Sequence, residues 1–197
     1  SKQERYNVQF ITMDLYKPYY KLMSNLFKNA ILIADRYHVI IQARNALDNT
    51  RIKLCTKNNT NCKKLKKHWK LLLKKEEELD NENKKYNKHF KKQVTQKDIV
   101  TYLINTNEQL YNDYQVYQGI EKAITSKDKE LFFKIVDNNI KNKKISKKMK
   151  KALKTYRDMK KYINNSLDYE YSNGIVEGIN NVIKQVKHVA CGYKKFN

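Results

Sequence analysis

Two short apolar segments that each stop at an aspartate constrain the fold of this chain most strongly. Residues 8–13 are apolar and rich in β-branched side chains, and they end at Asp14. Residues 31–34 repeat this pattern and end at Asp35. Both segments predict buried strands. The intervening residues, with Pro18 in the first turns, predict a helix. A strand, helix, strand succession of this length implies a parallel pair of strands joined by a crossover.

Helical patterns account for most of the remaining sequence. The crossover helix carries one apolar stripe, and a second helix is expected to begin near His38. Between about residues 58 and 168 glycine and proline nearly vanish and no strand pattern is found. We interpret this block as an all-α insertion, with expected helix starts at Thr95 with Asp98, at Ser126 with Glu130, and at Ser146. The apolar stripes of these helices are Leu15, Tyr19, Leu22, Leu26 and Phe27; Ile40, Ala43 and Leu47; Leu65, Trp69, Leu72 and Leu79; Val100, Leu103, Leu110 and Tyr114; Leu131, Phe132, Ile135, Val136 and Ile140; and Met149, Leu153, Tyr156, Met159, Ile163 and Leu167.

The charge balance points to a polyanionic partner. Lys and Arg number 42 against 20 Asp and Glu, a formal net charge of +22. Heavy use of Lys, Asn, Ile and Tyr is typical of A/T-rich codon bias, which explains part of this surplus, yet the excess raises affinity for DNA whatever its origin. One dense cluster is expected either to contact flanking DNA or to form a solvated face; it consists of Lys63, Lys64, Lys66, Lys67, Lys70, Lys74 and Lys75. Trp69 and the tyrosines of residues 111–117 could stack on bases, but their helical spacing favours the core.

Several classes of protein are disfavoured. The three cysteines, Cys55, Cys62 and Cys191, form no C-x-x-C pair, so neither a zinc site nor a disulfide framework is expected. No apolar run approaches the roughly 18 residues that cross a bilayer, and no signal peptide is recognisable. We therefore expect a cytoplasmic, nucleoid-associated protein with no membrane partner.

The last helix isolates a single carboxylate. Three of the four glycines fall between Gly174 and Gly192, and Ser172 or Asn173 would serve as the N-cap. Glu177 then lies in the first turns, where the helix dipole favours a negative charge. At about 100° per residue, the polar face and the apolar face separate cleanly. The polar face holds Glu177, Asn181, Lys184 and His188, and the apolar face holds Ile175, Ile179, Val182, Ile183, Val186 and Ala190.

The motif Y-S-N-G-x-x-E-G-x-N-N-x-I-K-x-x-K over residues 171–187, followed by G-Y-x-x-F over 192–196, closely resembles the C-terminal signature of bacterial insertion-sequence transposases of the ISL-three family. Residues 11–14, 27–30, 34–39 and 46–48, with Tyr19 and Arg51, also resemble that family in order and spacing. The matches cover roughly residues 8–55 and 169–197.

The resemblance implies a fold and a set of catalytic residues. The fold class would be α/β and helix-dominated, a partial ribonuclease-H-like domain interrupted by an all-α insertion. Residues 1–57 would be the strand-helix-strand-helix part of the catalytic domain, residues 58–168 the insertion, and residues 169–197 the returning catalytic helix. Asp14 would correspond to the second catalytic acid and Glu177 to the third, both of them metal ligands.

Several roles stay open at this point. Asp35 and His38 correspond to a D-x-x-H element, in which the histidine could orient Asp35 or a DNA phosphate. Alternatively, Asp35 caps a helix and His38 merely packs beside it. A competing alignment makes Asp35 the second acid. The resemblance favours Asp14, because in the ribonuclease-H-like fold that acid follows the strand next to the first catalytic strand, and Asp35 comes one strand later. Asn181, Lys184 and Lys187 would hold target phosphates or form a solvated face.

Two acids that meet at the ends of strands repel each other unless a divalent cation lies between them, and oxygen ligands suit Mg²⁺ or Mn²⁺. We therefore expect two-metal phosphoryl transfer on DNA, at element ends and target, by a homo-oligomer. The family's first acid lies on an earlier strand, so we expect this chain to be a fragment that is inactive alone. The alternatives are a basic helical nucleic-acid-binding module without catalysis and a helical protein that binds anionic membrane surfaces.

Overall fold

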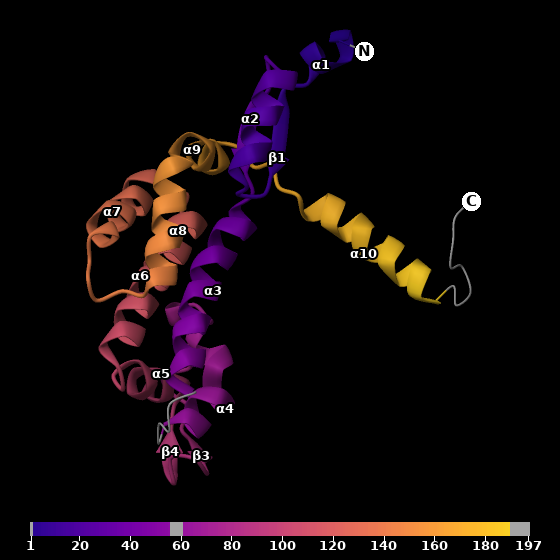
Figure 1. Cartoon of the computed structure of the whole chain (residues 1–197). Coiled ribbons are helices and arrows are strands. Elements are labelled where there is room, and N and C mark those ends of the chain that lie inside the picture. The colour runs from indigo at the N-terminus through magenta and orange to yellow at the C-terminus, as the bar shows by residue number, and fades with distance from the viewer. Residues whose placement is uncertain (1, 56–60, 190–197) are drawn as a thin grey trace.

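The computed structural model describes residues 2–55 and 61–189, and the backbone is mainly helical (Figure 1). The G-Y-x-x-F part of the C-terminal motif and Cys191 lie outside the described residues. In chain order the elements are α1 Lys2–Asn7, β1 Phe10–Met13, α2 Lys17–Leu26, β2 Ile31–Ala34, α3 Arg36–Cys55, α4 Cys62–Leu72, the 3₁₀ helix η1 Glu76–Glu78, β3 Lys85–Asn87, β4 Lys92–Val94, α5 Gln96–Ile104, α6 Glu108–Thr125, α7 Lys129–Ile140, α8 Lys147–Asp158, α9 Lys160–Asp168 and α10 Gly174–Val189. Every described helix falls short of the length and apolarity that a bilayer crossing requires.

The predicted strand pair is present. β1 and β2 are parallel, with Phe10 opposite Ile31 and Met13 opposite Ala34. The carboxyl ends of both strands therefore lie at the same edge of this small sheet. The helix-dominated α/β class is confirmed. The ribonuclease-H-like assignment stays a prediction.

The crossover helix α2 is rotated from the orientation that its apolar stripe suggests. A stripe of this kind usually faces the core, yet Tyr19, Leu22 and Leu26 are exposed. Tyr20 points inward instead, and its hydroxyl donates a hydrogen bond to the carbonyl oxygen of Met13 at 3.1 Å. Because this hydroxyl can satisfy a buried carbonyl at the strand end, the tyrosine takes the inner position from the aliphatic residues.

The long helix α3 joins the strand pair to the helical block. It packs along α6 and α8, and α9 covers β2. The stripes expected for α4 to α9 supply most of one continuous hydrophobic core, which also includes Leu32 and Ala34 of β2. Residues 58–168 thus share their interior with the strand segment, so the packing of α3 fixes where the strand ends lie relative to the block.

Two expectations for the block differ from the structure. The description "all-α" is wrong for residues 85–94, where β3 and β4 form an antiparallel hairpin. Its residues are mostly polar, with Val94 buried, so the hairpin shows no hydrophobic alternation. The expected helix start at Ser126 is also wrong: Ser126 ends α6, and Asp128 caps α7 by accepting a hydrogen bond from Leu131 N at 2.8 Å. The starts at Thr95 and Ser146 are confirmed.

Tyr156 links α8 to the beginning of α3. Its side chain is fully buried, and its hydroxyl donates to the carbonyl oxygen of Val39 at 2.7 Å. Tyr156→Phe is expected to lower the free energy of unfolding by about 1 kcal/mol, because the packing is kept while one buried hydrogen bond is lost. Urea unfolding measures this, with Tyr111→Phe, at a ring that is 42% exposed, as the control. Equal midpoints for the two variants would contradict it.

Helix α10 projects away from the rest of the molecule (Figure 1). Its start is anchored, because Tyr169 and Tyr171 pack against Phe10 of β1 at ring-centroid distances of 5.0 and 4.5 Å. From Val176 to Val189 the large apolar side chains face solvent, with exposed fractions between 45% and 80%. These exposed side chains are Val176, Ile179, Val182, Ile183, Val186 and Val189.

Candidate metal site

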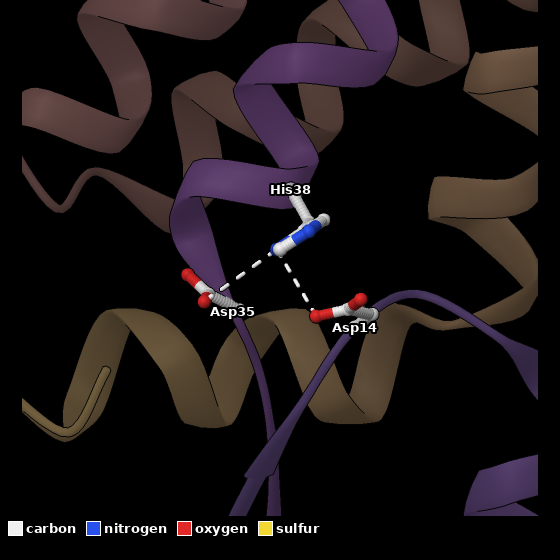
Figure 2. A group of neighbouring side chains, drawn as sticks. All are labelled: Asp14, Asp35 and His38. Atoms are coloured by element: carbon white, nitrogen blue, oxygen red, sulfur yellow. Dashed lines mark ion pairs between the residues drawn. The ribbon is translucent and has the colours of Figure 1, made fainter. Parts of the chain in front are cut away.

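Three potential metal ligands meet at the edge where both strands end (Figure 2). Asp14 follows β1 directly, Asp35 lies between β2 and α3, and His38 lies in the first turn of α3. The sheet register brings the first two together, since Met13 is opposite Ala34. The backbone N–H of Asp35 also donates to the carbonyl oxygen of Met13 at 2.9 Å, which extends the pairing to the site itself.

The histidine lies between the two carboxylates. His38 Nδ1 is 3.2 Å from Asp14 Oδ1 and 3.5 Å from Asp35 Oδ2, and Figure 2 shows its ring pointing toward both. One ligand atom from each residue lies within 4.8 Å of the other two. The side chain of Asp14 is 54% exposed, whereas that of Asp35 is 3% exposed. The site therefore has one open carboxylate and one buried carboxylate.

Asp35 makes two contacts, one with the start of α3 and one with His38. Its Oδ1 accepts a hydrogen bond from the backbone N–H of Tyr37 at 2.9 Å, so it caps α3 as expected for an aspartate before a helix. Its Oδ2 faces His38. The hydrogen bond at the helix start holds the Asp35 carboxylate in place, and its second oxygen, Oδ2, is directed at His38.

The cluster has the properties of a site for one divalent cation. His38 Nδ1 is buried and has no hydrogen-bond partner, although two carboxylate oxygens lie nearby. A buried polar atom without a partner is uncommon and costs free energy. A cation between the two carboxylates and the imidazole nitrogen would satisfy this atom and remove the repulsion between the acids. The residues present therefore fit a divalent metal ion.

Asp14 and Asp35, the two alternatives for the second acid, lie close together in the structure. Both carboxylates face the same imidazole nitrogen, so either alignment leads to this one cluster. Asp14 is the carboxylate open to solvent. Asp35 is buried and already holds the first turn of α3.

Glu177 is not brought to this cluster. It lies in the first turns of α10, which extends away from the strand ends, and it is exposed. Asn181, Lys184 and Lys187 lie further along the same helix and are exposed as well. The meeting of Glu177 with Asp14 stays a prediction, as do the DNA contacts of the three residues beyond it.

Some lysines of the basic cluster at residues 63–75, in and just after α4, already have partners within the protein. Lys64 lies over the ring of Tyr102 at 4.2 Å, Lys74 donates to Gln96 Oε1 at 3.2 Å, and Lys75 pairs with Glu121 at 3.6 Å. The remaining lysines of the cluster are exposed on the surface. The expectation that this cluster contacts flanking DNA stays a prediction for those exposed lysines.

The aromatic residues of α6 divide between the core and the surface. Tyr114 and Tyr117 are buried, which agrees with the core interpretation, whereas Tyr111 is exposed. Trp69 of α4 is half-buried and stacks under the guanidinium of Arg51 at 5.7 Å.

One group of residues went unnoticed in the sequence. Gln42 and Asn45 follow His38 on the same face of α3, and they line a groove together with Lys148 and Lys151 of α8. The signal was present, because positions 38, 42 and 45 have helical spacing and α8 begins with a repeated pair of lysines. The sequence does not reveal, however, that α3 and α8 are neighbours.

Comparison with known proteins gives a family. The DDE transposase profile of the ISL3 type, described as "Transposase", matches residues 1–197. A protein from Lactococcus lactis subsp. lactis named "ATP-dependent protease" is 33% identical over 117 residues, which cover 58% of this chain and 37% of that protein. No solved structure matches. Because the profile match spans the whole sequence, this chain belongs to the ISL3 family of DDE transposases.

Proposed function

We propose that this chain supplies part of the catalytic centre for DNA transposition, with metal-dependent cleavage and strand transfer at element ends. Asp14 serves as the second catalytic acid and Glu177 as the third. Membership of the transposase family supports the activity in general. The single observation that carries the assignment is the cluster of Asp14, Asp35 and His38, in which three potential ligand atoms converge at the ends of parallel strands.

Each residue of the cluster has a role in the proposed metal site. Asp14, Asp35 and His38 would hold one of the two cations of a two-metal centre, and this cation would be Mg²⁺ or Mn²⁺. Carboxylate oxygens suit both ions, and the imidazole nitrogen favours Mn²⁺, which accepts nitrogen more readily than Mg²⁺ does. Asp35 fixes the position of His38 through the start of α3, and the open side of Asp14 is where a phosphodiester oxygen enters. Such cations supply charge neutralisation and activate the attacking oxygen in phosphoryl transfer.

The partners follow from charge and family. DNA is the substrate, both at the element ends and at the target, and the net charge of +22 supports a strong electrostatic contribution to its binding. Asn181, Lys184 and Lys187 contact DNA phosphates when α10 is placed against the strand layer. We expect a homo-oligomer assembled on DNA, because two element ends must be held together.

The family resemblance puts the first catalytic acid on a strand earlier than the one that ends at Asp14, and we assign no residue of this chain to that acid. We therefore expect this chain alone to bind metal and DNA without cleaving DNA. Nicking of inverted-repeat DNA by the purified chain, lost on Asp14→Ala, would contradict that expectation.

Metal binding by the purified chain tests the proposal directly. Asp14→Asn is expected to weaken Mn²⁺ binding by at least about tenfold, because removing one ligand costs no less than removing an outer contact of a metal site. Isothermal titration calorimetry measures the affinity. Asp158→Asn is the matched control, since its side chain is 53% exposed and that of Asp14 54%. Equal Mn²⁺ affinities for the two variants would refute the site.

The second candidate function is a basic nucleic-acid-binding module without catalysis, which the net charge of +22 favours. It predicts DNA binding with no specific Mn²⁺ site, so the same titration separates the two. The name of the Lactococcus relative suggests nucleotide-driven proteolysis. The 197 residues contain no G-x-x-x-x-G-K-[ST] phosphate-binding loop, and we do not propose that activity.

A further inference from the structure

A polar groove runs between α3 and α8. It has a volume of about 290 Å³ and is lined by Gln42 and Asn45 from α3 and by Lys148, Lys151 and Thr155 from α8. Two alanines, one from each helix, form its floor. Small residues at these facing positions let the helix backbones approach while leaving an open channel between the longer side chains on either side.

The groove leads to the metal cluster. His38, Gln42 and Asn45 are spaced by four and three residues, so they lie on one face of α3. Helix α8 runs antiparallel to α3. Its Tyr156 bonds to Val39 near the start of α3, while Ser146 before its first turn bonds to Asp113, which accepts from Thr50 near the end of α3. Thr155 therefore lies at the cluster end of the groove and Lys148 at the far end.

The lining suits a nucleic-acid backbone. Lys148 and Lys151 are exposed and lie one helical turn apart on the groove side of α8. Gln42 Oε1 is buried without a hydrogen-bond partner, so a donor from a bound molecule would satisfy it. The acid at the end of α8, Asp158, is paired with Lys17 at 3.7 Å, which reduces its repulsion of phosphate.

We propose that this groove holds the DNA strand whose phosphodiester reaches the cluster of Asp14, Asp35 and His38. The inference rests on the proposed function, because that function names DNA as the substrate. Lys148 and Lys151 neutralise successive phosphates, which fixes the path of the strand without reading its sequence. Gln42 and Asn45 hydrogen-bond the sugar or base groups of the nucleotides nearest the cluster.

The test compares two pairs of basic residues on the same helix. Lys148→Gln with Lys151→Gln removes the groove charges. Lys150→Gln with Arg157→Gln removes equal charge from the opposite face of α8, because these two residues are seven positions apart and neither lines the groove. DNA binding by the full chain is measured by fluorescence anisotropy of a labelled duplex over a range of salt concentrations. The groove pair is expected to reduce the magnitude of the slope of log K against log salt by about 1.8, from about 0.9 for each lost phosphate contact, whereas the control pair leaves it nearly unchanged.

The other outcomes are equally decisive. Equal slopes for the two pairs, or no DNA binding by the wild-type chain, would overturn the groove assignment. A larger effect of the groove pair on an RNA strand of the same sequence than on DNA would also overturn it. Gln42→Ala is expected to weaken DNA binding without changing the salt slope, because an amide contact releases no counterion. A wild-type chain that shows the groove effect but binds no Mn²⁺ would support the groove and refute the metal site separately.

Discussion

Under the proposed function, Asp14→Ala is expected to lower excision of the element by about three orders of magnitude in a transposase that carries these residues. In the proposed metal site the Asp14 carboxylate is the ligand open to solvent, and its loss would leave the cation with only His38 and the buried Asp35. A correctly held cation contributes several kcal/mol to the transition state of phosphoryl transfer, and each 1.36 kcal/mol is about tenfold in rate. A donor plasmid that carries the element ends and a reporter for excision gives the measurement.

Two further variants make the excision assay specific. Asp158→Ala removes an acid of nearly equal exposure and is expected to leave excision close to wild type. Glu177→Ala should match Asp14→Ala if both acids serve one centre, although Glu177 is not among the described residues that form the cluster. If excision by Asp14→Ala stays within about tenfold of wild type, Asp14 is not a catalytic acid. The chain would then be a basic module that binds DNA through its positive charge.

Asp113→Ala is expected to destabilise the protein by about 2–4 kcal/mol, because it removes a buried group that accepts two hydrogen bonds. Asp113 is fully buried in α6, accepts a hydrogen bond from Thr50 Oγ1 at 2.6 Å and accepts another from the backbone N–H of Ser146 at 2.9 Å. It therefore joins α6 to α3 and to the start of α8. Alanine leaves the Ser146 N–H without a partner, whereas Thr50 can still donate to the carbonyl oxygen of Ala46 at 3.3 Å.

Asp113→Asn separates the hydrogen bonds from the charge. The amide keeps an acceptor for Ser146, and its NH₂ group can donate to Thr50, so at neutral pH its free energy of unfolding is expected to equal or exceed that of wild type. Burial raises the pKa of Asp113 above its ordinary value of 3.8, because the ionised form is poorly solvated. In wild type the contribution of this group to stability is complete below 3.8 and falls as the pH rises through the raised pKa.

The two substitutions give a clear pH signature. The stability of Asp113→Asn relative to wild type should grow as the pH is raised from below 3.8 toward neutral, and the deficit of Asp113→Ala should persist near neutral pH. Urea unfolding at a series of pH values, followed by circular dichroism, provides the data. A deficit in Asp113→Asn as large as that of alanine would show that the negative charge itself holds α8 in place.

Local sequence signals predicted those parts of the structure that depend on local interactions. Strands ending at Asp14 and Asp35, and helix starts at Thr95 and Ser146, follow from side chains that act within a few residues. The core of the helical block follows from strong apolar periodicity. The hairpin at residues 85–94 has too few buried residues to produce such a pattern.

The features that require distant residues could not be read in the same way. The inward turn of Tyr20 depends on a carbonyl of β1, and the groove depends on α8 lying beside α3. The closeness of His38 to both aspartates depends on the register of two strands. Family resemblance named Asp14, Asp35 and His38 in advance, but only the fold shows that they form one cluster.

The exposed apolar face of α10 has a consequence for the colloidal behaviour of the chain. At low ionic strength, molecules that each carry a net charge of +22 repel one another, and this repulsion keeps the valine and isoleucine side chains of α10 apart. Near 1 M salt the screening length falls to about 3 Å, and the repulsion is largely lost. Concentrated solutions should therefore turn cloudy when salt is added and clear again on dilution into low-salt buffer, the reverse of ordinary salting-in.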